Sequence, residues 1–280
     1  MSRVTPQDSE KRDASVGREE LRRLEGAFGQ LPLSFEPNAG QFEPGVGFAA
    51  RGDGYVVSLK PTGVEISLRG RPRRAEEEPA AAARAETSSD PRAAGRIGVR
   101  LLGANPAARV SGADPLPGVS NYFVGRDPSA WRAGVPTFAR VGYGGVYPGV
   151  DLVYYGNGRR LEYDFLVAPG ADPRRIALEF DGAEDLRLDA NGDLVLRAAG
   201  GGELRQHRPV SYQLIGGERR EVESRYALSG DNRVAFELGD YDARHPLVID
   251  PVISYSTYLG GTGFDEALAV ARGSDGSLYV

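Results

Sequence analysis

Short segments in which apolar and polar residues alternate recur along most of this chain, and they constrain its fold more than any other feature. In VEISL, Val64, Ile66 and Leu68 alternate with Glu65 and Ser67. Alternation with a period of two is typical of a strand with one buried face. Comparable segments follow at spacings of about ten residues, namely VGFAA, YVVSL, VRLL, NYFV, DLVYY, LEYDFLV, IALEF, LRL, LVL, VSYQLI, EVESRYAL, VAFEL and PLVIDPVISY. The pattern predicts an all-β, antiparallel sandwich or barrel-like domain, and it leaves open one body or two packed subdomains.

The connections between these segments carry residues that form turns. The chain contains 38 Gly and 19 Pro, which favours many turns over long helices. Asn191-Gly192, between LRL and LVL, is a hairpin signal. Asp127-Pro128 and Asp172-Pro173 are each predicted to cap a single helical turn.

Composition excludes several classes of function. The net charge of -5 is spread along the chain, so no extended basic face is available for nucleic acid. The absence of cysteine excludes disulfides, thiolate catalysis and Cys-ligated zinc. No apolar run approaches about 18 residues, and the first residues lack an apolar core, so neither a membrane span nor a signal peptide is predicted in this chain.

The sequence divides into three regions. Residues 1–30 are a polar leader followed by a short amphipathic helix in REELRRLEGAF. Residues 31–253 are the predicted all-β domain, and within it residues 69–96 have almost no large apolar side chain and are expected to form a flexible insertion. Residues 254–280 are a separate C-terminal segment.

One turn has the residue spacing that begins a calcium loop. Asp189, Asn191 and Asp193 follow the i, i+2, i+4 pattern of oxygen ligands. The later glycine and the distal bidentate glutamate of such a loop are missing, and Leu194 already begins the next apolar segment. A hairpin turn is therefore the preferred interpretation, and calcium binding is left open.

A pair of carboxylates lies on one face of LEYDFLV. Glu162 and Asp164 alternate with Leu161, Tyr163 and Phe165, so their carboxylates are expected roughly 5 to 7 Å apart. That distance overlaps the separation found in glycosidases. A polar outer face on an antiparallel strand gives the same pattern and is the preferred interpretation.

Two further motifs give no site. Arg51-Gly52-Asp53 spells a tripeptide that integrins bind, but it lies between FAA and YVV, where a tight hairpin needs such residues. His207 and His245 are near neither a Gly-x-Ser-x-Gly elbow nor a His-Glu-x-x-His pair, which argues against a catalytic triad or a His-based metal site.

Aromatic residues are the remaining candidates for ligand contact. Trp131 and the tyrosines Tyr143, Tyr147, Tyr154 and Tyr155 are suited to stacking on sugars. Aromatic residues on strands more often fill the core or its rim, and that interpretation is preferred.

The C-terminal segment contains the pattern of a β-hairpin. In YSTYLGGTGFDEALAVARGSDGSLYV, LAVA and LYV flank Asp275-Gly276. An isolated hairpin is marginally stable and leaves an open edge, so further neighbours are expected. The segment resembles the opening of an SBBP-type bacterial β-propeller repeat. The motifs before it, including LPLSFEPNAGQF, GVSNYFVGRDPSAWRAGVPTFARV and HPLVIDPVISYSTYLGG, resemble the uncharacterised domain commonly found N-terminal to those repeats.

The resemblance implies a large, exported bacterial protein, of which this chain is expected to be a fragment that ends within the first propeller repeat. We therefore expect a non-enzymatic exported or cell-surface module with a structural or adhesive role, and a protein or glycan as its partner. No catalytic, cofactor-binding or metal-binding residue is assigned, and no cofactor is expected. The alternative is a carbohydrate-binding or carbohydrate-active domain. The oligomeric state is left open.

Overall fold

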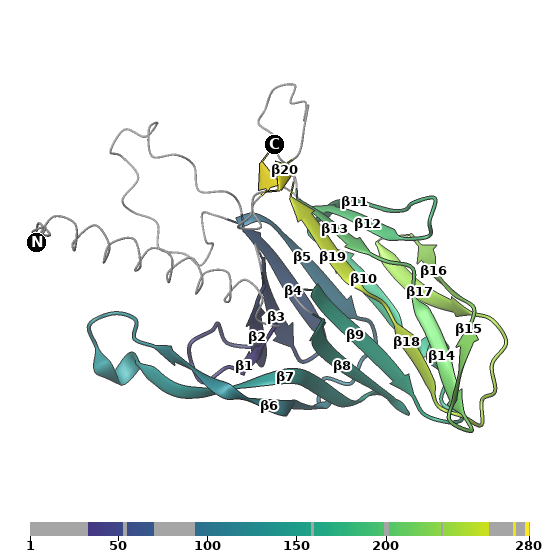
Figure 1. The fold of residues 1–280 in the computed structure, drawn as a ribbon, viewed down its shortest axis with the longest axis horizontal. Helices are drawn as coiled ribbons and strands as arrows, with labels where there is room; N and C mark the ends of the chain where they lie inside the picture. Colours follow the sequence, from purple (N-terminus) through teal and green to yellow (C-terminus); the bar gives the residue numbers. More distant parts are fainter. Residues whose placement is uncertain are drawn as a thin grey trace, which may run out of the picture. The chain divides into compact units, whose positions relative to one another are not determined.

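A computed structural model describes residues 33–52, 55–69, 93–157, 160–198, 202–230, 232–257, 271–272 and 278–279. The range Leu33–Tyr258 forms one compact unit, so the predicted strands belong to one body and not to two subdomains. The described residues of this unit form antiparallel strands and two short 3-10 helices (Figure 1). No helix among the described residues is long and apolar enough to cross a membrane.

A 15-stranded sheet makes up most of this body. Its strands are β1 (Phe35–Pro37), β2 (Phe48–Arg51), β3 (Tyr55–Lys60), β4 (Gly63–Arg69), β5 (Ala93–Leu101), β6 (Arg109–Tyr122), β7 (Arg132–Tyr147), β8 (Val150–Asn157), β9 (Arg160–Val167), β10 (Ala177–Asp181), β14 (Val210–Ile215), β15 (Glu218–Val222), β16 (Ser224–Ser229), β17 (Arg233–Leu238) and β18 (Leu247–Asp250). Hydrogen-bonded neighbours follow the order β15-β14-β18-β9-β8-β7-β1-β2-β3-β4-β5-β10-β17-β16, and β6 lies beside β7.

Strand β7 is where this sheet divides into two halves. One edge of β7 pairs with β6 from Gly144 to Arg132. The other edge is shared, because Tyr143 pairs with Leu152 of β8 while Phe138 pairs with Phe35 of β1. The two halves that leave β7 in this way enclose a common core.

The sheet comes close to forming a closed barrel. Strands β15 and β16 stand at opposite ends of the strand order, yet only Glu223 separates them in the chain. The antiparallel, barrel-like architecture predicted from the strand pattern is thus confirmed.

A smaller four-stranded sheet completes the body. It consists of β11 (Ala183–Leu188), β12 (Leu194–Ala198), β13 (Gly202–Gln206) and β19 (Ile253–Thr257), in that order. Its apolar residues Leu194, Leu196, Leu204 and Ile253 belong to the same buried cluster as the residues of the long sheet.

The core follows from the alternation in the sequence. In β9, Leu161, Tyr163 and Phe165 are buried, and Phe165 packs edge-on against Phe236 of β17 with ring centroids 5.8 Å apart. This contact joins the two halves of the long sheet. Burial of one such side chain contributes roughly 1.5–3 kcal/mol.

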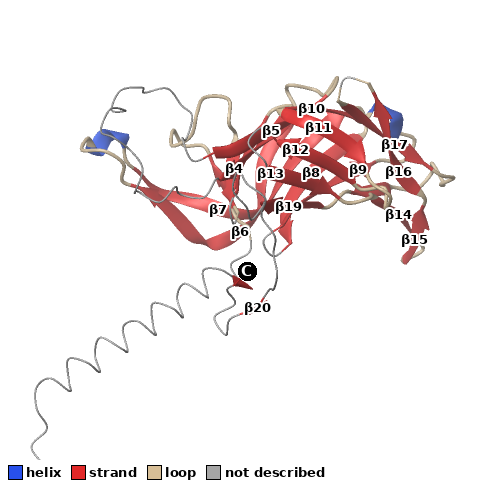
Figure 2. Ribbon diagram, turned by 90° about the horizontal axis from the view of Figure 1, so that it is seen from above, coloured by secondary structure: helices blue, strands red, loops and turns tan. Residues whose placement is uncertain are grey.

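The β6–β7 hairpin extends beyond the sheet, and both views show it projecting from the body (Figures 1 and 2). Its far end contains the 3-10 helix η1 (Pro128–Ala130), capped by the Asp127 side chain, which accepts from the Ser129 N–H. The second 3-10 helix, η2 (Pro173–Arg175), is capped by Asp172 in the same way. Both predicted caps are therefore confirmed.

Local differences from the sequence prediction are few. EVESRYAL is not one strand, because it is divided at Glu223 between β15 and β16. The expected insertion at 69–96 is narrower, since Arg69 ends β4 and Ala93–Arg96 opens β5 by pairing with β4. Residues 70–92, the polar leader and the expected N-terminal helix lie outside the described residues. Of the C-terminal segment, β20 (Ala271–Arg272) and β21 (Leu278–Tyr279) pair as an antiparallel hairpin.

Candidate functional site

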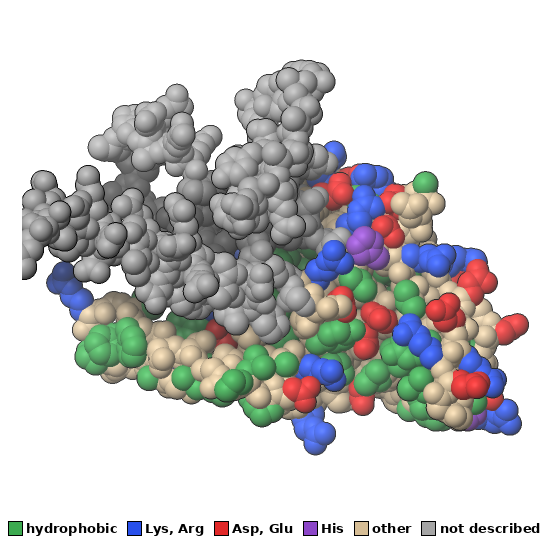
Figure 3. Space-filling model, viewed as in Figure 1, with side chains coloured by type: hydrophobic (Ala, Val, Ile, Leu, Met, Phe, Trp, Pro, Cys, Tyr) green, Lys and Arg blue, Asp and Glu red, His purple; other side chains and the backbone are tan. Residues whose placement is uncertain are grey.

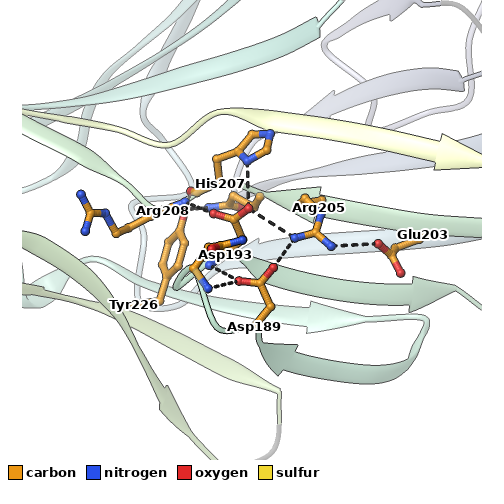
Figure 4. Close-up of polar contacts among 9 residues, drawn as sticks. Asp189, Asp193, Glu203, Arg205, His207, Arg208 and Tyr226 are labelled. Atoms are coloured by element: carbon orange, nitrogen blue, oxygen red, sulfur yellow. Dashed lines mark hydrogen bonds and ion pairs between the residues drawn. The ribbon is translucent and has the colours of Figure 1, made fainter.

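The residues with calcium-loop spacing, Asp189, Asn191 and Asp193, lie in the turn between β11 and β12, where they form the hydrogen-bonded hairpin of the preferred interpretation (Figure 4). One Asp189 carboxylate oxygen accepts from the backbone N–H groups of Asn191 at 2.8 Å and Asp193 at 3.0 Å. Gly192 follows with a φ of 80°, which is why this turn needs glycine. The hairpin interpretation of Asn191-Gly192 is confirmed.

Both aspartates of this turn contact nitrogen atoms of β13 and of the residues that follow it. Arg205 Nη1 binds Asp189 Oδ2 and also lies 3.3 Å from Asp193 Oδ2. Asp193 Oδ2 lies 3.0 Å from His207 Nδ1, and its other oxygen accepts from the Arg208 N–H at 2.9 Å. Side-chain and backbone nitrogens therefore surround these two carboxylates (Figure 4).

These contacts explain the low pKa values of the two aspartates. The Arg205 guanidinium holds the pKa of Asp189 below its usual range. Burial alone would raise the pKa of Asp193, but hydrogen bonds from the Arg208 N–H, His207 and Arg205 hold it below its usual range. Among the described residues, no group of three or more His, Cys, Asp or Glu is placed to hold a metal ion. The geometry favours a structural role for this turn.

Glu162 and Asp164 share the outer face of β9, as the sequence predicts. The Glu162 side chain is largely enclosed, with the residue 7% exposed, and accepts from Asn157 Nδ2 at 3.1 Å. Asp164 accepts from the Tyr155 hydroxyl at 3.0 Å. The next strand, β18, adds Asp250, whose Oδ1 is buried without a hydrogen-bond partner among the described residues.

Burial and neighbouring charge raise the pKa values of Asp164 and Asp250. Burial raises the pKa of Asp164 to about 6, and the charge of Asp250 adds to this shift. Burial also raises the pKa of Asp250, with the charge of Glu162 as the next cause. This cluster therefore keeps a proton at a pH where ordinary aspartates have lost theirs.

We predict that Asp164→Asn changes how stability depends on pH. The raised pKa means that the folded protein binds this proton more tightly than the unfolded chain, so the contribution of Asp164 to stability falls as pH rises from about 4 to about 6. Above this range Asp164→Asn should be more stable than wild type, by on the order of 1 kcal/mol after solvent screening. Urea denaturation at a series of pH values measures the difference. The exposed Asp240→Asn is the control, and a pH curve for Asp164→Asn that parallels wild type would contradict the assignment.

Most of the tyrosines considered for sugar stacking are in the core. Tyr143, Tyr147 and Tyr154 are between 1% and 2% exposed. The Tyr143 hydroxyl donates to the Lys60 carbonyl at 3.0 Å. Only Tyr155 is half-buried on the outer face. The preferred interpretation of these strand aromatics as core residues is confirmed for three of the four tyrosines.

Trp131, in contrast, lies in an exposed apolar group at the end of the β6–β7 hairpin. This hairpin tip comprises Phe123, Val124 and Trp131, which are 62%, 72% and 39% exposed. The Phe123 and Trp131 rings meet edge-on with centroids 5.3 Å apart. Figure 3 shows apolar side chains gathered at this end of the hairpin. The sequence pattern placed Phe123 and Val124 in a strand and gave no sign of their exposure.

A buried carboxylate of β1 anchors the β6–β7 hairpin at β6, a few residues before the hairpin tip. Glu36 of β1 is 8% exposed, accepts from Ser120 at 2.9 Å and is hydrogen-bonded to the Tyr122 hydroxyl. Arg51 Nη1 donates to the Tyr122 hydroxyl at 2.7 Å and lies 3.3 Å from Glu36 Oε1. The hairpin is thus fixed to β1 and β2.

The structure also places Arg51 and Gly52 of the Arg51-Gly52-Asp53 motif, and both histidines. The Arg51 side chain is committed to the hairpin anchor, and the Gly52 N–H donates to the Tyr55 carbonyl at 3.0 Å across the turn, while Asp53 lies outside the described residues. His207 and His245 belong to different clusters, because His245 contacts Asp242 at 3.8 Å.

Comparison with known proteins matches the main body of the chain. A family model described as "Domain of unknown function (DUF7948)" matches residues 35–252. No curated protein and no solved structure matches the chain. The family match ends before residues 254–280, so the resemblance of that segment to a propeller repeat stays a prediction.

Proposed function

Because the chain belongs to the DUF7948 family of domains of unknown function, we propose that it is a non-enzymatic interaction module of an exported or cell-surface protein. Residues 31–253 form the module in this proposal, and residues 254–280 begin a β-propeller of SBBP-type repeats. The module presents its hairpin tip to a protein or glycan at the cell surface.

The observation that carries this proposal is the exposure of the hairpin tip. Phe123, Val124 and Trp131 expose apolar surface at the end of a projecting hairpin. Such contiguous apolar surface is costly in water and is typical of contact sites. Aromatic residues are also the side chains that most often dominate binding energy in protein interfaces.

The propeller part of the proposal rests on the chain direction and on the resemblance of the C-terminal segment. Strand β19 (Ile253–Thr257) pairs with β13 and completes the small sheet. The YSTYLGG motif begins within this strand. The last strand of the body therefore leads directly into the segment that resembles a propeller repeat.

We predict that the native protein fractionates with the cell surface and that its binding there depends on the tip. Labelled chain carrying Phe123→Ser and Trp131→Ser should bind intact source cells at least about tenfold more weakly than wild type. Its melting temperature should stay close to wild type, because both residues are exposed. Fluorescence binding assays measure the difference.

The matched control for this experiment is Leu228→Ser, which alters an apolar residue that is 44% exposed and lies on β16, away from the tip. It should bind as wild type does. A native product found only in the cytosol would contradict the surface location, and equal binding by wild type and the tip variant would contradict the role of the hairpin.

Carbohydrate binding is the second candidate function. Hydrolysis at Glu162 and Asp164 requires a glycosidic oxygen to reach Glu162, which is enclosed and bonded to Asn157. Of the two forms of this candidate, we therefore propose sugar binding and not hydrolysis. A groove elsewhere on the body favours it.

A further inference from the structure

A groove of about 770 Å³ opens near the edge strand β16, beside η2. Its walls are η2 and the residues before it, the start of β16, the end of β17, and the loop that follows β17. Ligand pockets in proteins commonly have volumes of about 300–1,000 Å³. The groove is therefore large enough for a small organic ligand.

Two ion pairs line this groove, and in each pair the positive and negative charges cancel. Arg174 forms a bidentate pair with Asp172, at 2.8 Å from Nε to Oδ1 and 3.1 Å from Nη2 to Oδ2. Arg225 Nε lies 2.6 Å from Glu237 Oε2, across the β16–β17 pairing. No net positive charge is left to attract an anion, while the remaining N–H groups and oxygen lone pairs are available to a ligand.

Apolar side chains make up the rest of the lining. Phe236, Leu238 and Tyr241 line the groove, and Leu238 and Tyr241 pack against the hydrophobic core. Phe236 is only 6% exposed. Aromatic surface beside paired charges gives this groove one apolar side and several polar groups.

The loop that carries Tyr241 is held in place before any ligand binds. Gln213, a residue of β14 that is 3% exposed, donates from Nε2 to the Asp242 carbonyl at 2.8 Å and accepts the Asp242 N–H at 2.9 Å. On the other wall, hydrogen bonds from the side chain and backbone of Arg174 hold the pKa of Asp172 below its usual range. Preorganisation of this kind reduces the entropy lost on binding.

We propose that this groove binds a neutral saccharide. Sugar hydroxyls both donate and accept, so they can bond to a carboxylate and a guanidinium of the same pair, while the C–H face of a pyranose packs on Tyr241. An anionic ligand would compete with Asp172 and Glu237 for arginines that are already paired. The inference gives the carbohydrate-binding candidate a site and is independent of the hairpin tip.

The test is isothermal titration of the full chain with neutral disaccharides (cellobiose, maltose, xylobiose) and with anionic digalacturonate. At least one neutral disaccharide should bind with a Kd on the order of 1 mM, and digalacturonate should bind more weakly. Tyr241→Ala should weaken binding of that disaccharide about tenfold. The double variant Arg225→Gln/Glu237→Gln removes both charges of this ion pair together and should weaken binding to a similar extent.

Control variants distinguish loss of the groove contacts from a loss of folding and from an effect of the hairpin tip. Trp131→Ala removes an exposed aromatic residue outside the groove and should bind the sugar as wild type does. If circular dichroism shows that Tyr241→Ala does not fold, the double variant provides the test of the groove. It should fold, because the ion pair that it removes is exposed and contributes little to stability. Equal sugar binding by wild type and the groove variants would show that the sugar binds elsewhere on the protein. It would contradict the assignment of the groove but not carbohydrate binding itself. If no neutral disaccharide binds, both the groove assignment and the carbohydrate-binding candidate are contradicted. Tighter binding of digalacturonate than of the neutral disaccharides would contradict the proposal that the ligand is neutral.

Discussion

Replacement of Phe165 by alanine should lower the free energy of unfolding by about 3–5 kcal/mol, the largest effect we expect from a single substitution. Phe165 is completely buried on β9. Its ring meets Tyr163 at 5.7 Å and Phe236 at 5.8 Å, centroid to centroid. Because Phe236 lies in the other half of the long sheet, the cavity left by the substitution would lie between the two halves and remove a contact that joins them. Urea denaturation followed by circular dichroism measures the loss.

The adjacent residue supplies the control for this experiment. Leu166 lies on the outer face of the same strand and is 39% exposed. Leu166→Ala should change the free energy of unfolding by less than about 1 kcal/mol, because the side chain lies at the surface and its truncation leaves no enclosed cavity. Similar losses for Phe165→Ala and Leu166→Ala would contradict the assignment of inner and outer faces.

The second large effect is expected from Gln213→Ala, which should cost about 2–3 kcal/mol. Gln213 is 3% exposed, and its Nε2 donates to the carbonyls of Asp242 at 2.8 Å, His245 at 3.2 Å and Pro246 at 3.3 Å. Its Oε1 accepts the Asp242 N–H at 2.9 Å. Without this carboxamide, backbone groups of the β17–β18 loop lose their partners in a partly enclosed site, which explains the expected cost.

Two measurements distinguish this effect from a general loss of packing. Hydrogen exchange at the Asp242 N–H should accelerate in Gln213→Ala relative to core amides of β9. The control is Gln41→Ala, in which a more exposed glutamine loses its bond to the Pro37 carbonyl at 2.8 Å and the bond that it accepts from the Ala39 N–H at 2.6 Å. Because water can replace both partners, this variant should cost less than about 1 kcal/mol. An unchanged exchange rate at Asp242 would contradict the role of Gln213 in fixing the loop.

The parts of the fold that the sequence predicts correctly depend on neighbouring residues. The meander from β2 to β4 follows from alternation, since Val64, Ile66 and Leu68 are buried as expected. The Asn191-Gly192 turn and the cap at Asp172 depend on bonds that span four residues or fewer. Such chemistry is visible in a short window of sequence.

The parts that could not be predicted depend on contacts between distant segments. Arg205 reaches both Asp189 and Asp193 only because β13 pairs with β12 in one register. The apolar run at Phe123 and Val124 has the composition of a buried strand, and its exposure follows from the length of the β6–β7 hairpin. Gln213 and Asp242 meet across 29 positions of the chain. No local pattern indicates any of these contacts.

The order of strands in the long sheet also determines when the body can be finished during synthesis. Strand β5 (Ala93–Leu101) has β10 (Ala177–Asp181) as its second neighbour. A ribosome that has released β5 must therefore translate through β6 to β9 before β10 can cover that edge. Contacts between such distant segments slow folding, because the intervening chain must be ordered first. In the interval the nascent chain has an uncovered β5 edge, the kind of intermediate that chaperones protect from aggregation.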